Sequence, residues 1–191
     1  MSENINIGSG MKKVKNFLNV DISPAMNPDQ VVDLNVTPWP WQDDEFDHIH
    51  ASHILEHLGQ DTKTYFSVWK ELYRVMKDQA VIKIIVPHWE HENFHHDPTH
   101  VRKVTPVGVD MFNQERNKQV IASGGSETTL GLQLGIDIEV YEVGYDFMPW
   151  FQNIIRGKPQ HFAELEMKKY NNACYQLQIN ARAHKPARGV Q

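Results

Sequence analysis

Short apolar segments, separated by polar loops that contain glycine or proline, run through the first half of the chain. Their length and composition predict β-strands at residues 4–7, 16–22, 30–34, 46–52 and 80–86. The last segment is rich in β-branched residues and ends at a proline, which is typical of a buried strand in a parallel sheet.

The clearest helical pattern covers residues 61–77, where Asp61 or Thr62 can cap the first turn. Apolar side chains recur at helical spacing within it, at Phe66, Trp69, Leu72, Tyr73 and Met76. A shorter helical turn is expected at residues 53–58, closed by a glycine. Because strands alternate with helices in this half, the pattern favours an α/β fold with a parallel sheet.

The second half of the chain is less regular. Residues 88–130 are polar, rich in histidine and interrupted by glycines, and we expect an elaborated loop with a helix near residues 107–112. Two late segments, residues 136–145 and 173–183, alternate like strands that pair antiparallel, with a helix at 162–170 between them.

A chain of 191 residues is the length of one domain, and we expect it at residues 1–184 with a flexible tail at 185–191. The net charge of −5 and the pI near 6.1 argue against nucleic-acid binding driven by phosphate neutralisation. No apolar stretch approaches the roughly 20 residues that cross a bilayer. The single cysteine, Cys174, excludes an internal disulfide, and the N-terminus lacks a secretory pattern, so we expect a cytoplasmic protein.

Candidate chemistry begins at Gly8-Ser9-Gly10, directly after the first strand. Glycines in such a turn let backbone amides approach a ligand that side chains would block. Asp21 follows thirteen residues after Gly8, at the end of the next strand, where an acidic residue typically accepts hydrogen bonds from ribose hydroxyls. The glycines alone also fit an ordinary tight turn, but their pairing with Asp21 indicates a nucleoside site.

Further motifs follow this pair in a fixed order. The series is Asn6-Ile7-Gly8-Ser9-Gly10, Asn19-Val20-Asp21-Ile22, Pro38-Trp39-Pro40-Trp41, Phe46-Asp47, Leu55-Glu56-His57-Leu58, Arg74-Val75-Met76-Lys77, Val86-Pro87-His88 and Asp97-Pro98-Thr99-His100. In this order and spacing, residues 5 to about 106 resemble the small class I S-adenosylmethionine-dependent methyltransferases. The resemblance implies a Rossmann-like, mostly parallel sheet with a late antiparallel strand pair, S-adenosylmethionine as cofactor, and methyl transfer (EC 2.1.1 class) as the activity.

The resemblance also implies a cofactor site built from three strand ends. The glycine turn would lie against the methionine part of the cofactor, Asp21 would bind the ribose, and Asp33 would meet the adenine amino group. Ile22 and Leu34 would pack beside the adenine, and two residues after the fourth strand would border the methionine end. The residues implied are Gly8, Ser9, Gly10, Asp21, Ile22, Asp33, Leu34, Ser52 and His53.

The chain departs from the family pattern near its N-terminus. Ten residues separate Gly10 from Asp21, which leaves room for little more than one helical turn instead of a full helix. Seven residues precede Gly8, so the helices that often cover the pocket are not expected. We therefore expect a truncated N-terminal helical part, with residues 88–130 or a second subunit in a homo-oligomer closing the cofactor pocket.

Nine of the eleven histidines form two clusters. The clusters are His48, His50, His53 and His57, and His88, His91, His95, His96 and His100. His53-x-x-Glu56-His57 matches an inverted zinc-peptidase motif, yet it follows a strand where Leu-Glu-His is ordinary for the methyltransferases. The second cluster, with Asp97, has the better composition for a metal, but we favour loop and pocket residues and assign no metal site.

The position of two histidines is informative in another way. Ligands of open α/β sheets bind outside the carboxyl ends of the strands, where His53 and His88 are expected. A neutral histidine there can accept a proton from an attacking hydroxyl or amine. We predict His88 as the catalytic base, with His100 or Asp97 as the alternative.

Methyl transfer to a small-molecule or saccharide acceptor by in-line displacement is the favoured function. Two other functions stay open. One is a non-catalytic methyltransferase-like binding module, and the other is a metal-dependent hydrolase that uses the histidine-rich loop. No membrane or strong nucleic-acid partner is expected.

Overall fold

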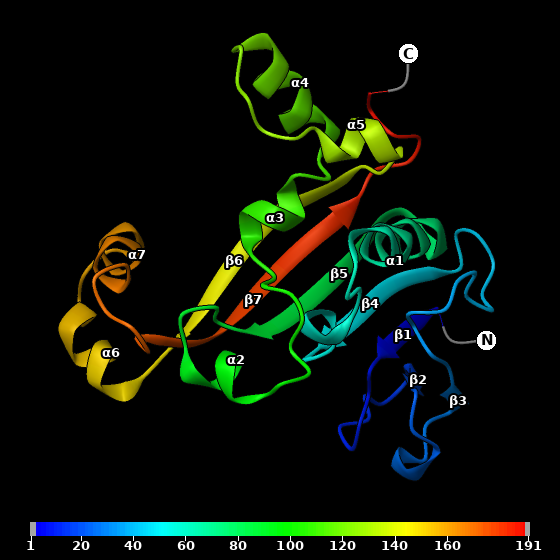
Figure 1. Ribbon diagram of the computed structural model, residues 1–191, viewed down its shortest axis with the longest axis horizontal. Coiled ribbons are helices and arrows are strands. Elements are labelled where there is room, and N and C mark those ends of the chain that lie inside the picture. The colour runs from blue at the N-terminus through cyan, green and yellow to red at the C-terminus, as the bar shows by residue number, and fades with distance from the viewer. Residues whose placement is uncertain (1–2, 190–191) are drawn as a thin grey trace.

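The computed structural model describes residues 3–189, which form one seven-stranded sheet in the order β3-β2-β1-β4-β5-β7-β6 (Figure 1). The strands are β1 (Asn4–Ile7), β2 (Leu18–Asp21), β3 (Gln30–Val31), β4 (Phe46–Ser52), β5 (Met76–Pro87), β6 (Ile138–Phe147) and β7 (Cys174–Ala183). The first five run parallel, and β7 pairs antiparallel with both β5 and β6. The predicted Rossmann-like sheet with a late antiparallel pair is confirmed.

The helix predicted at 61–77 is α1 (Thr62–Val75), and Asp61 caps it by accepting a hydrogen bond from the Thr64 amide at 3.0 Å. Trp69 lies on its buried face and stacks on Phe112 with 4.6 Å between ring centroids. The helix ends two residues earlier than predicted, because Met76 already has extended backbone and pairs with Phe46 at the start of β5.

Other helical segments are short. They are η1 (Pro24–Met26), η2 (Leu55–His57), α2 (Glu92–His96), α3 (Pro106–Asp110), α4 (Gln114–Ala122), α5 (Leu130–Leu134), α6 (Pro149–Ile155) and α7 (Gln160–Met167). The expected loop at 88–130 thus contains three helices, and the helix expected at 162–170 begins and ends earlier, as α7.

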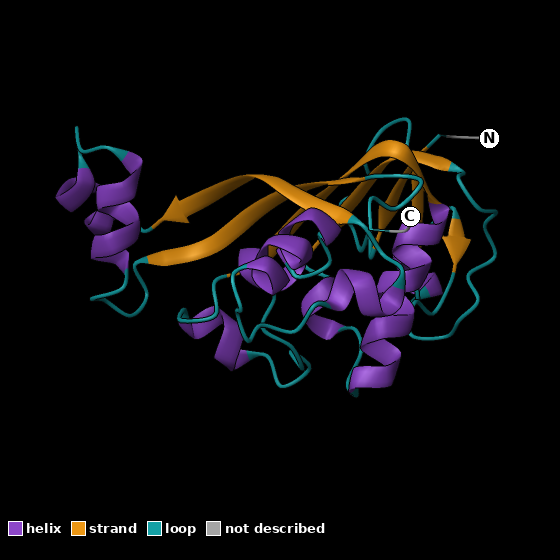
Figure 2. Cartoon of the chain, turned by 90° about the horizontal axis from the view of Figure 1, so that it is seen from above, coloured by secondary structure: helices purple, strands orange, loops and turns teal. Residues whose placement is uncertain are grey.

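Helices cover only one face of the sheet. Figure 2 shows them gathered on one side, with α6 and α7 beyond the end of the β6–β7 pair. Within residues 3–189, the chain between β1 and β4 contains one helical element, the 3₁₀ turn η1. A sheet covered on both faces would have α-helices in these connections. The other face of the sheet is therefore bare.

The bare face carries polar side chains in register across six strands. The row consists of Asn19, Asn6, His50, Lys83, Asn180 and Glu142, each paired with the next on the neighbouring strand. Residues paired in this way point to the same face. The neighbours Ile49, Ile82 and Ile179 point to the covered face and are fully buried. Buried and more exposed side chains alternate along β5, and Lys83 is exposed. The prediction of a buried strand is therefore wrong for this face of β5.

Two asparagines hold the chain where a helix is missing between β1 and β2. Asn6 Nδ2 donates to Asn19 Oδ1 at 2.9 Å and to the Lys12 carbonyl at 3.2 Å. Asn19 Oδ1 also accepts from the Val14 amide at 2.8 Å. These bonds satisfy buried amides and fix residues 11–17 as a loop, as the short spacing predicted.

The C-terminal segment 185–189 is tied to the body of the domain, contrary to the flexible tail expected at 185–191; residues 190 and 191 lie outside the described residues. Arg188 donates to both carboxylate oxygens of Asp137, at 2.9 and 3.0 Å, and Asp137 is fully buried. Burial opposes ionisation of Asp137, but the bonds from Arg188 and from backbone amides outweigh it and hold its pKa below the ordinary value.

We predict that Arg188→Ala lowers the free energy of unfolding by about 3 kcal/mol at pH 7, because it leaves a buried carboxylate without its cation. A depressed pKa contributes stability above the unfolded value of about 4, so the difference from wild type should shrink as the pH falls below it. Chemical denaturation at several pH values measures this, with Arg156→Ala on the exposed surface as control. Equal losses in both variants would contradict the assignment.

Candidate functional site

The carboxyl ends of the parallel strands meet at one edge of the sheet. Ile7 pairs with Ala51, Ser52 with Ile85, and Pro87 with Gln176. The glycine turn, His53 and His88 each follow one of these strand ends, so they emerge at the same edge, as predicted.

The turn after β1 requires its glycines. Gly8 has φ +64°, and a Cβ there would lie 2.6 Å from the side chain of Ile54. Gly10 has φ +47°, and no heavy atom lies within 4 Å of the place its Cβ would take. The turn therefore packs closely against Ile54 at Gly8 and is open at Gly10, where the backbone amides of the turn can approach a ligand.

Asp21 lies directly against this turn. The Gly10 amide donates to its Oδ2 at 2.8 Å, and the Ser23 amide donates to its Oδ1 at 2.9 Å. Among residues 3–189 no cation forms an ion pair with Asp21. Each carboxylate oxygen keeps acceptor capacity for a ligand hydroxyl.

A pocket of about 500 Å³ opens beside the turn. It is lined by Asn6, the turn and loop residues 8–14, His50, Ser52 and His53. The volume suits a small ligand or cofactor. Ser9 Oγ is buried there without a hydrogen-bond partner, which leaves a polar atom for a bound group to satisfy.

Some residues of this pocket were missed from the sequence. Lys12 lies in the shortened connection after the glycine turn, and His50 lies on the bare face of β4. A signal existed for both: a lysine pair one residue after the glycine turn, and a histidine at the position before Ala51 in an alternating strand.

The residues that the resemblance places beside the adenine follow the ends of β2 and β3. Ile22 is 61% exposed, so its side chain is free to pack on a ligand. Asp33 accepts the Asn35 amide at 2.9 Å, and Leu34 is buried in the core. The side chain of Ile22 is therefore open to contact with a ligand, whereas little of the Leu34 side chain is accessible.

His53 faces a hydrogen-bond acceptor at each ring nitrogen. Its Nε2 lies 3.0 Å from Gln176 Oε1, and its Nδ1 lies 3.4 Å from Glu56 Oε1. Gln176 turns its oxygen toward the ring because its Nε2 donates to Asp146. Glu56, partly offset by burial, raises the pKa of His53 above its ordinary value. The protonated ring is therefore favoured at the end of β4.

His88 does not have the geometry expected of a base. It is 4% exposed, and its Nδ1 accepts the Glu90 amide at 3.1 Å, so the basic lone pair is occupied. Burial lowers its pKa to about 4. It lines a separate pocket of about 260 Å³ with Tyr145 and Tyr170. His100 and Asp97 lie 3.8 Å apart and do not line the pocket at the glycine turn.

Comparisons with known proteins agree with this geometry. Residues 6–84 match the family model described as a methyltransferase domain, and this stretch contains the glycine turn, Asp21 and His53. This stretch is similar to a methyltransferase domain. S-adenosylmethionine is the cofactor that this similarity implies. No curated protein matches the chain significantly.

The solved structures similar to this chain are distant in sequence. A SAM-dependent methyltransferase from Archaeoglobus fulgidus has TM-score 0.56 and 19% identity, covering 94% of this chain and 85% of its own. The complex of the Haloferax volcanii Trm112 methyltransferase activator with a methyltransferase has TM-score 0.53 and 14% identity, covering 95% and 82%. The [4+2]-cyclase SpnF has TM-score 0.53 and 13% identity, covering 95% and 75%. These likenesses show a shared fold.

None of the helices in the described part of the chain has the length and apolar character needed to cross a bilayer.

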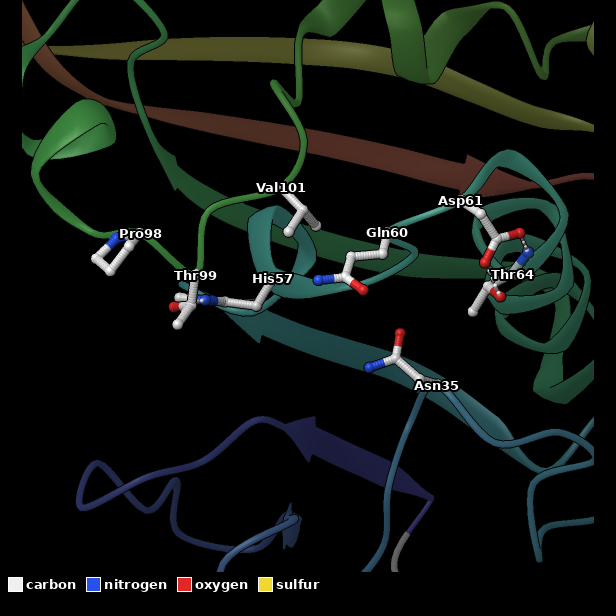
Figure 3. Close-up of a pocket in the computed structure, with 8 residues that line it drawn as sticks. All are labelled: Asn35, His57, Gln60, Asp61, Thr64, Pro98, Thr99 and Val101. Atoms are coloured by element: carbon white, nitrogen blue, oxygen red, sulfur yellow. Dashed lines mark hydrogen bonds between the residues drawn. The ribbon is translucent and has the colours of Figure 1, made fainter.

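A second pocket, also about 500 Å³, lies between η2, the start of α1 and the loop after α2 (Figure 3). It is lined by Asn35, His57, Gln60, Asp61, Thr64, Pro98, Thr99 and Val101. In Figure 3 the side chains of His57 and Thr99 lie against each other, and Asp61 accepts the hydrogen bond from the Thr64 amide that caps α1. This pocket brings η2 together with the loop that follows α2.

We predict that His53 titrates above pH 6.5 in histidine NMR spectra, and that Glu56→Gln lowers its pKa. A raised pKa contributes stability below the unfolded value of about 6.5, and that contribution is lost as the pH rises through the folded value. Gln176→Ala, which removes the weaker partner, should lower the pKa less. A midpoint at or below 6.5 in the wild type would contradict the contact.

Proposed function

We propose that this chain transfers a methyl group from S-adenosylmethionine, bound across the glycine turn and the end of β2, to a small polar molecule or a saccharide. The hydrogen bond from the Gly10 amide to Asp21 is the observation that supports it most directly, and Gly10 also lines a pocket of suitable size. This hydrogen bond joins the two motifs that typically recognise an adenosyl group, a glycine turn with accessible backbone amides and a carboxylate at the end of the next strand.

The residues present fit the cofactor. When bound, S-adenosylmethionine supplies a methyl group on a positively charged sulfur. The amides of Gly8, Ser9 and Gly10 would border its methionine part, together with Ser52 and His53. Asp21 would accept from the ribose hydroxyls, and Ile22, Asp33 and Leu34 would border the adenine. Lys12, on the pocket wall, has the charge to pair with the amino-acid carboxylate.

An oxygen or nitrogen acceptor must also lose a proton. We propose His50 for this role instead of His88, because His50 lines the pocket at the turn. Burial, with a smaller effect of Lys83, lowers the pKa of His50, so its ring is neutral at pH 7. Orientation of the two reactants can supply about 7–11 kcal/mol of the barrier lowering, so positioning carries most of the catalysis.

Polar groups on β6 and β7, which reach the pocket residue His53 through Gln176, support a class of acceptor. Gln176 and Gln178 both donate to Asp146, and Asn180 donates to Glu142. Amides and carboxylates of this kind pair with hydroxyl groups, which supports a sugar or another hydroxylated acceptor. The net charge of −5 disfavours a polyanion. We further propose a cytoplasmic enzyme whose pocket a second copy closes.

A non-catalytic methyltransferase-like module is the second candidate. The lack of helices over β1 and β2 favours this candidate, because less of the protein would surround a bound cofactor. The similar structure of the cyclase SpnF also indicates that this fold does not by itself imply methyl transfer. Tight cofactor binding without turnover of labelled S-adenosylmethionine, across a broad panel of hydroxylated acceptors, would favour the module.

We predict that the chain binds S-adenosylhomocysteine in calorimetry and that Asp21→Asn weakens binding about 10–100-fold, because charge-assisted hydrogen bonds to the ribose contribute about 1.5–3 kcal/mol. Glu115→Gln, an exposed carboxylate on α4, is the matched control and should leave affinity unchanged. No wild-type binding at millimolar ligand, or equal affinity in wild type and Asp21→Asn, would contradict the proposal.

A further inference from the structure

The fold joins two histidine segments that lie far apart in the sequence. Glu56 and His57 belong to η2, whereas His100 follows α2. Ligand atoms of these three residues all lie within 4.8 Å of one another, and the rings of His57 and His100 stand 4.6 Å apart, edge to face. The Glu56 carbonyl accepts the Val101 amide at 2.9 Å, which fastens the two segments side by side.

Hydrogen bonds set the free nitrogen of each ring. His100 Nδ1 lies 2.8 Å from the Phe94 carbonyl, which can only accept, so Nδ1 carries the hydrogen. Its Nε2 therefore presents a lone pair whenever the ring is neutral. This is how metal-binding histidines are usually oriented, with the outer nitrogen bonded to a carbonyl.

His57 is oriented by a short relay. Thr99 Oγ1 donates to Asp97 Oδ1 at 2.6 Å, so its own hydrogen is used. The oxygen must then accept from His57 Nδ1, 2.9 Å away, which leaves the lone pair of His57 on Nε2. Two imidazoles thus offer Nε2 lone pairs in one small space.

The third group, Glu56, has an unusual environment. The residue is 0% exposed, and neither carboxylate oxygen has a hydrogen-bond partner; the nearest basic atom is His53 Nδ1, 3.4 Å from Oε1. The long contact to His53 leaves this buried carboxylate poorly compensated, which favours binding of a further cation or a proton. One of its oxygens lies within 4.8 Å of a ring nitrogen of each of the two histidines.

We propose that Glu56, His57 and His100 bind a divalent transition-metal ion of the zinc type. Two imidazole nitrogens and one carboxylate form a ligand set that zinc and similar metals accept, with one further position for water. At zinc–ligand distances near 2.1 Å, tetrahedral ligand atoms stand about 3.4 Å apart, so modest side-chain movement closes the site. The bound ion would tie the loop at residues 97–101 to η2, on the wall of the pocket in Figure 3.

This site goes beyond the proposed methyl transfer, and its ligands are separate from the residues proposed for the cofactor. It also replaces our expectation, from the sequence, that the histidine clusters hold no metal.

Zinc chloride titrated into purified, untagged protein tests the proposal by calorimetry, with metal content measured by mass spectrometry. We expect saturable binding of about one Zn²⁺ per chain and a higher melting temperature with the ion than without it. His57→Ala and His100→Ala should weaken binding at least tenfold and abolish the temperature shift. Thr99→Val, which removes only the orienting hydroxyl, should weaken binding about 10–100-fold.

His96→Ala is the matched control, because His96 is an exposed histidine of the neighbouring helix α2. It should bind zinc like the wild type. Cobalt substitution should give visible absorption bands without a thiolate band. No saturable binding, unchanged affinity in His100→Ala, or an equal loss in His96→Ala would overturn the proposal.

Discussion

The bare face of the sheet is the constraint on which the rest of this structure depends. With no helix to cover β1, β2 and β4 on that side, the strands carry polar side chains there, which face water or, at Asn6 and Asn19, bond to the loop at residues 11–17. These side chains form a row of polar residues in register, from Asn19 on β2 to Glu142 on β6. The remaining faces of the strands pack against the helices between β4 and β6.

The same constraint shapes the candidate site. The loop that replaces a helix after the glycine turn is held by Asn6 and Asn19, and it brings Lys12 to the pocket wall. His50, a member of the polar row, lines that pocket from below. In a sheet covered by helices on both faces, apolar side chains would occupy these positions. The missing helix therefore allows the polar side chains Lys12 and His50, to which we assign cofactor binding and proton acceptance.

Much of the fold could be predicted because its signals are local. Strand positions follow apolar segments, and the glycine turn and Asp21 are close in sequence and meet across neighbouring strands. The one-sided burial of β5 was harder to see, since Val81 and Ile85 are apolar although they alternate with buried residues, and only Lys83 breaks the run. The end of α1 was misjudged because apolar spacing continues through Met76 into β5.

The chemistry of individual histidines could not be predicted in this way. The role expected for His88 depended on a free lone pair, and only the fold shows that the Glu90 amide occupies it. The contact of His57 with His100 joins positions 43 residues apart, through a turn and a loop whose paths no local pattern specifies. Strand-end position predicted which residues gather at the sheet edge, but not their protonation or partners.

Lysine footprinting tests the bare polar face most directly. Lys83 lies in the centre of the polar row, and Lys63 lies on the exposed surface of α1. We predict that mass spectrometry after brief reductive methylation finds Lys83 modified at a rate similar to Lys63. Strong protection of Lys83 while Lys63 reacts would show that this face is covered, and would contradict the account.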